Sequence, residues 1–353
     1  MLYLHSKSPL DIFKRTIPFI IFLETKLENP KHTMVQFDHF DTAKDVPDLS
    51  GKVILLTGGT GGVGKQAVLQ LAAHNPSQIF FTGRNKSAAE SIISSAASSS
   101  STKLTFLPME LTSLKDIKAT ADKILASTYR LDVFIANAGM ISDAGVTQDG
   151  YEVQFGTNHL GNAALLLHLL PLMLKTAKTS DKKKSDVRFV ALSSLGYRYH
   201  PPAGIDFDTL KSAQADMSFG NWQRYSQSKL ANILFARELA RRYPDLLTSC
   251  AIHPGVVETE FVTEMGFWNR ALVRVSQAVQ GKSMMTPEQG CVNTVWAATS
   301  PDVKGKLGKG KVAFFEPVGK PNGGDEKCFD QALMQKLWEW TEEQVGVKAP
   351  AAS

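Results

Sequence analysis

A glycine-rich turn between an apolar run and a helical pattern constrains the fold of this chain more than any other stretch. The run Val53-Ile-Leu-Leu56 leads into Thr57-Gly-Gly-Thr-Gly-Gly-Val-Gly64, after which apolar residues recur at helical spacing. This order predicts a strand, a tight turn and a helix. Glycines let the backbone lie against a ligand, and the start of a helix offers free N–H groups and a positive dipole end to phosphate. The stretch therefore predicts a phosphate-binding loop.

Two kinds of phosphate-binding loop match this spacing. Gly59, Gly61 and Gly64 satisfy the dinucleotide pattern G-x-G-x-x-G, whereas residues 59–65 satisfy all but the last position of a nucleoside triphosphate loop. Gln66 stands where the second motif needs a Ser or Thr hydroxyl to hold magnesium, so the triphosphate interpretation lacks its metal ligand. The dinucleotide interpretation is favoured, and a purely structural glycine turn is the remaining alternative.

Strand-like apolar runs alternate with helical patterns through most of the chain. Runs at residues 53–56, 78–82, 104–109, 131–136, 187–192 and 247–252 predict six strands, and residues 311–315 predict one more. Helices are expected between them, including 113–127, 151–175, one capped by Asn221, one capped by Thr286, and 331–345. The alternation predicts an α/β fold with a single doubly wound Rossmann-type parallel sheet of about seven strands and helices on both faces.

The ends of the chain and one internal segment fall outside this pattern. We expect residues 48–345 to form a single Rossmann-type domain, with a poorly ordered N-terminal extension over 1–47 and a tail over 346–353. Residues 261–285 lack a strong period and contain Phe267 and Trp268, so they are interpreted as a lid. The apolar stretch 17–23 is too short to span a bilayer. We expect no transmembrane segment, and a weak peripheral membrane contact through residues 12–23 stays open.

Composition excludes several classes of function. At 353 residues and 43% hydrophobic content, the chain can bury a large core. Its net charge of +5 comes partly from a lysine run at 182–184, and no basic stripe with interleaved aromatic residues marks a nucleic-acid interface. The three cysteines, at 250, 291 and 328, are too few and too scattered for a disulfide framework or a metal site. We therefore expect a cytoplasmic protein without a metal, which could form a homodimer.

Arg84 follows the second predicted strand, about twenty residues beyond the glycine turn. In a dinucleotide-binding fold this position reads the adenosine ribose, and an acidic residue there accepts a hydrogen bond from the 2′-hydroxyl. The residues present are Gly83, Arg84 and Asn85. A guanidinium suits a 2′-phosphate instead, through charge-assisted paired hydrogen bonds. The position therefore favours NADP(H) over NAD(H), with a solvated arginine in a turn as the alternative.

Four polar residues are predicted at the edge of the sheet where parallel strands end: Asn158, Ser194, Tyr225 and Lys229. Tyr225 and Lys229 are four residues apart and share a helix face. A free tyrosine has a pKa of about 10, so it needs a nearby positive charge to act as a base at neutral pH, and Lys229 would supply that charge. Ser194 could hydrogen-bond a substrate oxygen. The set predicts proton transfer at a carbonyl or alcohol oxygen beside a nicotinamide ring.

These residues together resemble a known enzyme family. The motifs are Thr57-Gly-x-x-x-Gly-x-Gly64, Asn137-Ala-Gly139, Asn158, Ser193-Ser194, Tyr225-x-x-x-Lys229, and Pro254-Gly255 followed by Thr259. In this order and spacing the chain resembles a short-chain dehydrogenase/reductase from Leu49 to about Val345. Asn158-His-Leu-Gly161 and the long insertion before Tyr225 are similar to the retinol dehydrogenase-like branch and its fungal relatives.

The resemblance implies a role for each matched residue. Tyr225 would be the general acid/base, and Lys229 would lower its pKa and bind the nicotinamide ribose. Ser194, rather than Ser193, would orient the carbonyl, and Asn158 would hold a water of a proton relay. The remaining cofactor contacts would come from Gly58, Gly62, Val63 and Gly64 at the pyrophosphate, Arg84 and Asn137 at the adenosine ribose, Glu110 and Leu111 at the adenine, and Val257 and Thr259 at the nicotinamide amide.

Two positions depart from the family pattern, and one question of function stays open. Glu110 stands where the family usually has Asp, and Ala136 replaces the first Asn of Asn-Asn-Ala-Gly. We expect an NADP-dependent oxidoreductase that interconverts a ketone or aldehyde and an alcohol on a hydrophobic small molecule, such as a polyketide, retinoid or steroid. A serine hydrolase is disfavoured because Leu192 occupies the first glycine of the G-x-S-x-G elbow. A non-catalytic NADP-binding sensor is the alternative.

Overall fold

A mostly parallel sheet forms the centre of the protein. The computed structural model describes residues 40–98, 100–179, 186–218, 220–258 and 284–351. Within these residues the sheet has eight strands in the order β3-β2-β1-β4-β5-β6-β7-β8. They are β1 (Val53–Leu56), β2 (Gln78–Gly83), β3 (Lys103–Pro108), β4 (Val133–Ala136), β5 (Arg188–Leu192), β6 (Thr248–Ile252), β7 (Phe314–Glu316) and β8 (Lys320–Asn322). The order reverses beside β1, which opens a ligand-binding crevice at the carboxyl ends of β1 and β4 in folds of this kind.

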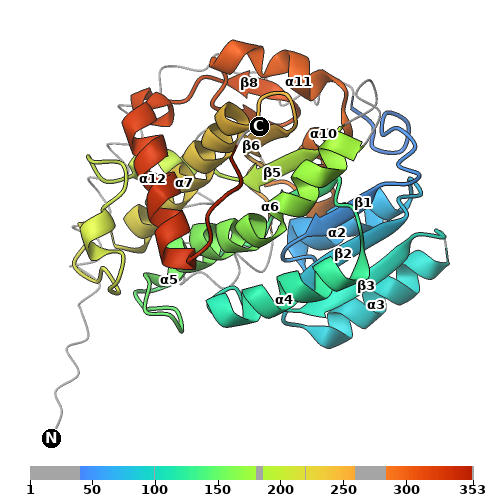
Figure 1. Cartoon of the computed structure of the whole chain (residues 1–353), viewed down its shortest axis with the longest axis horizontal. Helices are drawn as coiled ribbons and strands as arrows, with labels where there is room; N and C mark the ends of the chain where they lie inside the picture. Colours follow the sequence, from blue (N-terminus) through green and yellow to red (C-terminus); the bar gives the residue numbers. More distant parts are fainter. Residues whose placement is uncertain (1–39, 99, 180–185, 219, 259–283, 352–353) are drawn as a thin grey trace, which may run out of the picture.

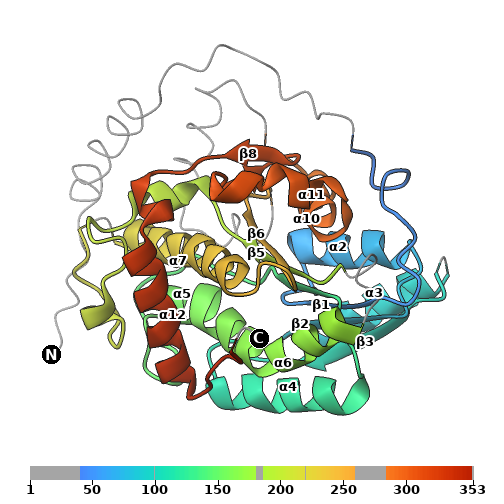
Figure 2. The ribbon, with the colours of Figure 1, turned by 45° about the horizontal axis from the view of Figure 1, so that its top comes forward.

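Helices cover both faces of the sheet (Figures 1 and 2). One face carries α4 (Leu114–Ser127), α6 (Gly161–Thr179), α7 (Asn221–Arg242) and α12 (Gln331–Val345). The other carries α2 (Gly62–Ala72), α3 (Lys86–Ala97), α10 (Pro287–Thr299) and α11 (Asp302–Lys306). Short helices complete the set: α5 (Val153–Phe155), the π-helix η1 (Gly156–Leu160), and the 3₁₀-helices η2 (Leu195–Tyr199), η3 (Phe207–Thr209), η4 (Gly308–Gly310) and η5 (Glu326–Phe329).

Covering both faces explains why the strands read as continuous apolar runs. In β1, Val53 and Leu55 belong to the core under α6 and α7, whereas Ile54 and Leu56 belong to the core under α2 and α10. All four residues are buried. Parallel sheets are usually covered on both faces, so their strands have no solvent-facing positions and apolar residues do not alternate with polar ones.

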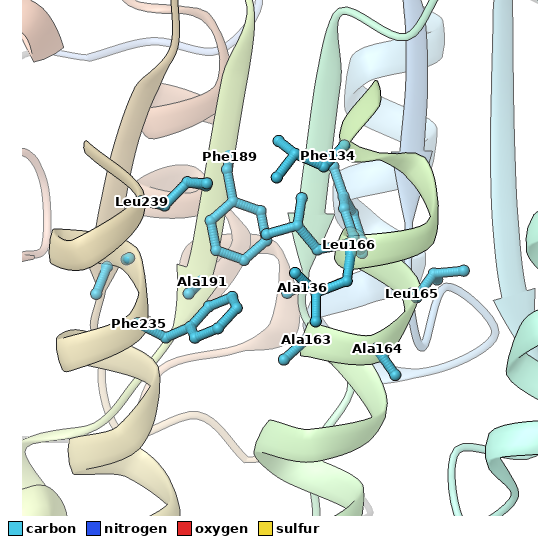
Figure 3. Packing of buried hydrophobic residues seen from close by; sticks show 14 of the residues in the cluster. Phe134, Ala136, Ala163, Ala164, Leu165, Leu166, Phe189, Ala191, Phe235 and Leu239 are labelled. Atoms are coloured by element: carbon cyan, nitrogen blue, oxygen red, sulfur yellow. The ribbon is translucent and has the colours of Figure 1, made fainter. Parts of the chain in front are cut away.

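The core on the α6 and α7 side is packed by aromatic and aliphatic side chains (Figure 3). The rings of Phe134 on β4 and Phe189 on β5 meet edge to face, with centroids 5.5 Å apart. Leu166 of α6 and Phe235 of α7 contribute to the same cluster (Figure 3). The stretch Val153–Thr179 is long and apolar enough to cross a membrane, but 83% of its apolar window is buried inside this core. Its apolar character is therefore explained by packing against the sheet.

The predicted doubly wound sheet with helices on both faces is confirmed, and its far edge differs from the prediction. The last expected strand, at 311–315, is β7, and it is followed by β8, which pairs with it antiparallel. The sequence pattern missed β8 because this strand has three residues, is largely exposed and contains Pro321. A proline at a sheet edge is tolerated because its missing N–H faces away from the ladder.

The helix starts provide a further comparison. Thr286 caps α10 as expected, and Ser113, the expected first residue of a helix, caps α4, since each side-chain oxygen accepts a hydrogen bond from a backbone N–H three residues on. The prediction that Asn221 caps α7 is wrong. Asn221 is the first helical residue, and the cap position is Gly220, whose φ of +55° suits glycine.

The predicted extension and lid have different outcomes. In the last part of the expected extension, Val46 is buried and Phe40 packs against the apolar cluster under α2 and α10. Residues 1–39, which include the apolar stretch, lie outside the described residues. Most of the expected lid, residues 261–283 of 261–285, also lies outside them.

Truncation of the core predicts a clear loss of stability. Leu166→Ala removes a fully buried side chain, so it should lower the free energy of unfolding by about 2–5 kcal/mol. Leu125→Ala makes the same chemical change at an exposed position of α4 and should change it by less than about 0.5 kcal/mol. Denaturant unfolding measures both values, and similar losses would contradict the assigned packing.

Candidate active site

The glycine turn after β1 is shaped by contacts that exclude side chains. Gly58 and Gly62 have φ values of +68° and +48°. A Cβ on Gly64 would lie 2.1 Å from the Gly58 carbonyl oxygen, and one on Gly59 would lie 2.8 Å from the Cβ of Phe81. The cap of α2 at Gly61 supplies no side-chain acceptor for the first turn of the helix. The turn therefore brings bare backbone and helix N–H groups to the carboxyl edge of the sheet, which fits a pyrophosphate.

A hydrogen-bond network fixes this turn against the end of β4. Asn137 Nδ2 donates to the carbonyl oxygens of Thr57 (2.8 Å) and Gly58 (3.2 Å). The buried Thr57 hydroxyl donates to Asn162 Oδ1 (2.7 Å) and accepts from the Ala138 N–H (3.1 Å). Asn162 Nδ2 in turn donates to the Ala138 carbonyl oxygen (3.1 Å). Asn162 was not predicted, because an asparagine inside a helix can equally be a solvated surface residue.

Asn158 lies in the π-helical turn η1, not in a regular helix. Its Oδ1 accepts from the Met140 N–H (2.6 Å), and its Nδ2 donates to the Met140 carbonyl oxygen and to Ser228 Oγ, both at 2.9 Å. Its own carbonyl oxygen accepts from Asn162 and Asn232, each at 3.2 Å. Both polar groups of Asn158 are therefore engaged within the chain, and π-helical turns of this kind are frequent at functional sites.

The two serines after β5 have different surroundings. Ser193 is buried, and its hydroxyl donates to the Lys229 carbonyl oxygen (2.7 Å). Ser194 is half-buried and forms a side-chain hydrogen bond with the Tyr225 phenol. Its Oγ also accepts from the Gly196 N–H at 3.1 Å. Of the two hydroxyls, that of Ser194 is the one placed beside the phenol.

Tyr225 and Lys229 share one face of α7, and both are buried. Lys229 Nζ lies 5.5 Å from the centroid of the Tyr225 ring and donates to the Leu192 carbonyl oxygen at 3.1 Å. The absence of a side chain at Gly139 leaves room for the ammonium group, since a Cβ there would lie 3.1 Å from Lys229 Nζ. The carboxyl ends of β4 and β5 thus bring a phenol, a hydroxyl and an ammonium together.

Burial sets the pKa of both ionisable groups. It raises the pKa of Tyr225 to about 12, and the hydrogen bond with Ser194 opposes that rise only in part. Burial also lowers the pKa of Lys229 to about 8. Desolvation of the phenol is therefore the largest influence on the pKa of Tyr225 in this arrangement, and the role of Lys229 in lowering that pKa stays a prediction.

The remaining predicted cofactor residues are spread along the same edge. Arg84 is exposed at the end of β2, and the neighbouring Gly83 packs so tightly that a Cβ there would lie 2.5 Å from Thr60 Oγ1. Glu110 is half-buried, and its carboxylate accepts from the Thr112 N–H at 3.4 Å. Four positions are apolar or undescribed: Val63 and Leu111 pack against the core, Val257 is buried, and Thr259 lies outside the described residues.

Other reactive side chains take no part in this cluster. Burial raises the pKa of the thiols of Cys250, Cys291 and Cys328 to about 12, so none of them is a nucleophile at neutral pH. His159 is buried in the core, and burial lowers its pKa to about 4. In the part of the chain that the structure describes, no group of three metal-ligating side chains is found.

Comparison with known proteins gives consistent matches. The family model described as short chain dehydrogenase matches residues 52–195. An uncharacterized oxidoreductase of Schizosaccharomyces pombe is 30% identical over 88% of this chain and 91% of its own length. Retinol dehydrogenase 14 of Homo sapiens is 33% identical over 85% of this chain and 88% of its own length. The fold matches that of the NADPH-bound carbonyl reductase from chicken fatty liver with a TM-score of 0.57 and 21% identity, covering 80% of this chain and 98% of that one.

The buried ammonium predicts a pH-dependent stability. Between about pH 8 and pH 10.5 the unfolded chain keeps the Lys229 proton and the folded chain does not, so the stability of the wild type rises with pH through that window. Lys229→Met lacks this rise. Its free energy of unfolding relative to wild type should fall by up to about 3 kcal/mol between pH 7 and pH 10.5.

Denaturant unfolding at a series of pH values measures this difference. Lys123→Met, which removes an exposed lysine of α4, serves as the control and should show no such change relative to wild type. Parallel stability curves for wild type and Lys229→Met would contradict the burial of a titrating ammonium.

Proposed function

Because the chain belongs to the short-chain dehydrogenase/reductase family, we propose that it reduces the carbonyl group of a hydrophobic small molecule with NADPH. Members of this family are NAD(P)-dependent oxidoreductases that act on CH–OH and C=O groups. The observation that carries the proposal is the cluster of Ser194, Tyr225 and Lys229 at the edge of the sheet where the glycine turn begins. A phenol, a hydroxyl and an ammonium there can bind a carbonyl oxygen and protonate it as it is reduced.

The residues of the turn fit a nicotinamide dinucleotide. Gly58, Gly62 and Gly64 present backbone where any larger residue would clash or be strained, and the N-terminus of α2 offers its free N–H groups to the pyrophosphate. Lys229 would hydrogen-bond the nicotinamide ribose, and Asn137 keeps the turn in place from the side of the adenosine ribose. When bound, the nicotinamide supplies the hydride.

Tyr225 and Ser194 act on the substrate oxygen. The two hydroxyls would donate hydrogen bonds to the carbonyl oxygen, where negative charge develops as the carbon accepts hydride. Because the Tyr225 pKa is about 12, the phenol carries its proton throughout the neutral range and can transfer it to that oxygen. The ammonium of Lys229 then lies beside the phenolate that this transfer leaves.

The raised phenol pKa supports reduction as the favoured direction. Alcohol oxidation needs Tyr225 as a base, and at neutral pH a phenol of this pKa is almost entirely protonated.

Asn158 is assigned a positioning role, because its side chain is used to hold Met140 and Ser228 and its carbonyl oxygen already accepts two hydrogen bonds. We infer that it shapes the floor of the site, and the relay water implied by the family resemblance stays a prediction.

NADP(H) is proposed over NAD(H) on the strength of Arg84. This exposed guanidinium follows β2, the strand that flanks β1 at the ribose end of the crevice. Gly83 and Asn85 beside it bring no carboxylate to repel a 2′-phosphate. Asn85 instead caps α3, because its side chain accepts from the Ala88 N–H, which leaves Arg84 as the side chain able to read the phosphate.

A hydrophobic substrate such as a retinoid, steroid or polyketide is proposed. Similarity over most of the chain to retinol dehydrogenase 14 supports this class, and so does Trp222, which is half-buried at the start of α7. The Trp222 ring stands edge-on to Tyr225, with centroids 6.4 Å apart, and places apolar surface beside the phenol. The non-catalytic sensor has no support from the relatives, whose names are those of oxidoreductases and dehydrogenases.

Substitutions at the three hydroxyls test the chemistry. Tyr225→Phe removes the proton donor and should lower kcat by about 10²–10⁴-fold. Ser194→Ala should lower it by about 10–10³-fold, because one donor to the developing oxyanion is lost. Ser193→Ala is the matched control, since that hydroxyl is satisfied by the Lys229 carbonyl oxygen. NADPH oxidation with a panel of hydrophobic ketones and aldehydes gives the rates, and equal losses at the two serines would refute the assignment.

Cofactor preference is tested at Arg84. Arg84→Ala should raise the KM for NADPH by about 10–100-fold, because a charge-assisted contact to the 2′-phosphate is lost. The KM for NADH should stay within about twofold of wild type, since that cofactor lacks the phosphate. Lys86→Ala, two residues on and also exposed, serves as the charge-matched control. A proportionate rise for both cofactors would contradict a phosphate-reading role.

A further inference from the structure

A network of buried polar side chains links the C-terminal helix to the carbonyl groups around Lys229. On α12, Thr341 Oγ1 lies 3.4 Å from His159 Nε2. His159 Nδ1 lies 3.3 Å from Asn232 Oδ1. Asn232 Nδ2 donates to the carbonyl oxygens of Leu192 (3.0 Å) and Asn158 (3.2 Å). The side chains of Thr341, His159 and Asn232 are all buried, that of Thr341 completely.

The chemistry of these groups determines which one donates and which one accepts each hydrogen bond of the network. Asn232 Nδ2 faces two carbonyl oxygens, which only accept, so the amide orientation is determined and Oδ1 must face His159. Because Oδ1 also only accepts, His159 Nδ1 must carry a proton. Burial keeps the pKa of His159 at about 4, so the ring is neutral and its Nε2 carries no proton. The Thr341 hydroxyl donates its one proton to the Leu337 carbonyl oxygen at 2.7 Å, so it makes only a polar contact with Nε2. One neutral tautomer therefore satisfies the link between His159 and Asn232.

The hydrogen-bond network meets the proposed catalytic cluster at a single atom. The Leu192 carbonyl oxygen, at the end of β5, accepts from both Asn232 Nδ2 and Lys229 Nζ. The second acceptor of Asn232 is the carbonyl oxygen of Asn158, which lies in the π-helical turn η1. The side chain of Asn158 accepts a hydrogen bond from the Met140 N–H. Asn232 therefore ties together the strand end that binds the ammonium and the turn that floors the site.

We propose that Asn232, oriented by His159, is a positioning residue that holds the Leu192 carbonyl and the Asn158 turn in the arrangement Lys229 requires. This inference rests on the proposed function in one respect, since it takes Lys229 to serve the cofactor and Tyr225. It extends that function by assigning a role to two residues that touch neither substrate nor cofactor. It also explains why a polar histidine is kept in an aromatic core, between Phe155 and Phe235.

Two substitutions at His159 separate hydrogen bonding from packing. His159→Asn and His159→Leu lose the same ring contacts and leave side chains of similar volume, but only asparagine retains a donor near the position of Nδ1. His159→Asn should keep kcat within about threefold of wild type, whereas His159→Leu should lower it about tenfold or more by releasing Asn232. Asn232→Leu, which removes the link itself, should lower kcat at least as much as His159→Leu.

A milder pair guards against loss of folding. Thr341→Val and Thr299→Val each remove a buried hydroxyl that donates to the carbonyl four residues earlier, on α12 and α10 respectively. Of the two, Thr341 is the one that contacts His159. Thr341→Val should therefore lower kcat by about two- to fivefold, while Thr299→Val should leave it unchanged at a comparable Tm.

The failure of this inference is distinguishable from failure of the proposed function. A wild-type protein that reduces no carbonyl in the panel would refute the function, and NADPH affinity measured by fluorescence quenching would then carry the test. Asn232→Leu and His159→Leu should weaken NADPH binding about fivefold or more through Lys229, and His159→Asn should not. Equal behaviour of His159→Asn and His159→Leu in both kcat and NADPH affinity, or an unaffected Asn232→Leu, would overturn the proposal.

Discussion

Burial of two ionisable side chains at the carboxyl ends of β4 and β5 is the constraint on which the site depends. Tyr225 and Lys229 lie in the first turns of α7, which packs against the sheet through a nearly continuous buried face. Taking both groups out of water disfavours the charged form of each, so the phenol holds its proton and the ammonium holds its own less firmly. The packing that stabilises the fold thus also prepares a proton donor.

The rest of the site depends on backbone groups held in place by amides. Asn137 and Asn162 fix the glycine turn against the end of β4, and Asn158 and Asn232 fix the end of β5 against the π-helical turn. Each amide joins its own segment to at least one other. Buried polar groups that are fully satisfied make an arrangement of loops specific, because any alternative would leave one of them unpaired. The crevice at the reversal of strand order is therefore rigid on the side of the cofactor and the ammonium.

Much of this architecture could be predicted from the sequence because both faces of the sheet are covered. Continuous apolar runs marked the strands, and hydroxyls at Ser113 and Thr286 marked helix starts. The glycine turn and Ser194 were predicted because each follows a strand end, and Tyr225 and Lys229 because a spacing of four residues places them on one helix face. The parts that were missed depend on the third dimension. The edge strand β8 is too short to show a period, and the π-helical turn follows from contacts between distant segments.

Depth of burial was the other property that the sequence could not show. Four residues separate Tyr225 from Lys229, and that spacing predicts attraction between phenolate and ammonium. Only the packing around α7 shows that desolvation is the larger effect. Asn162 and Asn232 escaped notice for a similar reason, because an asparagine inside a helix has no sequence signature that distinguishes a bridge between backbone carbonyls from a solvated surface residue.

The most direct test of the account is the titration of the Tyr225 phenol itself, followed by NMR in protein labelled with ¹³C at tyrosine Cζ and assigned by comparison with Tyr225→Phe. The account predicts that this resonance stays that of a neutral phenol through the neutral range and titrates at about pH 12. A resonance already that of a phenolate near neutral pH would contradict the account, because Tyr225 would then be a base suited to alcohol oxidation and not the acid that completes carbonyl reduction.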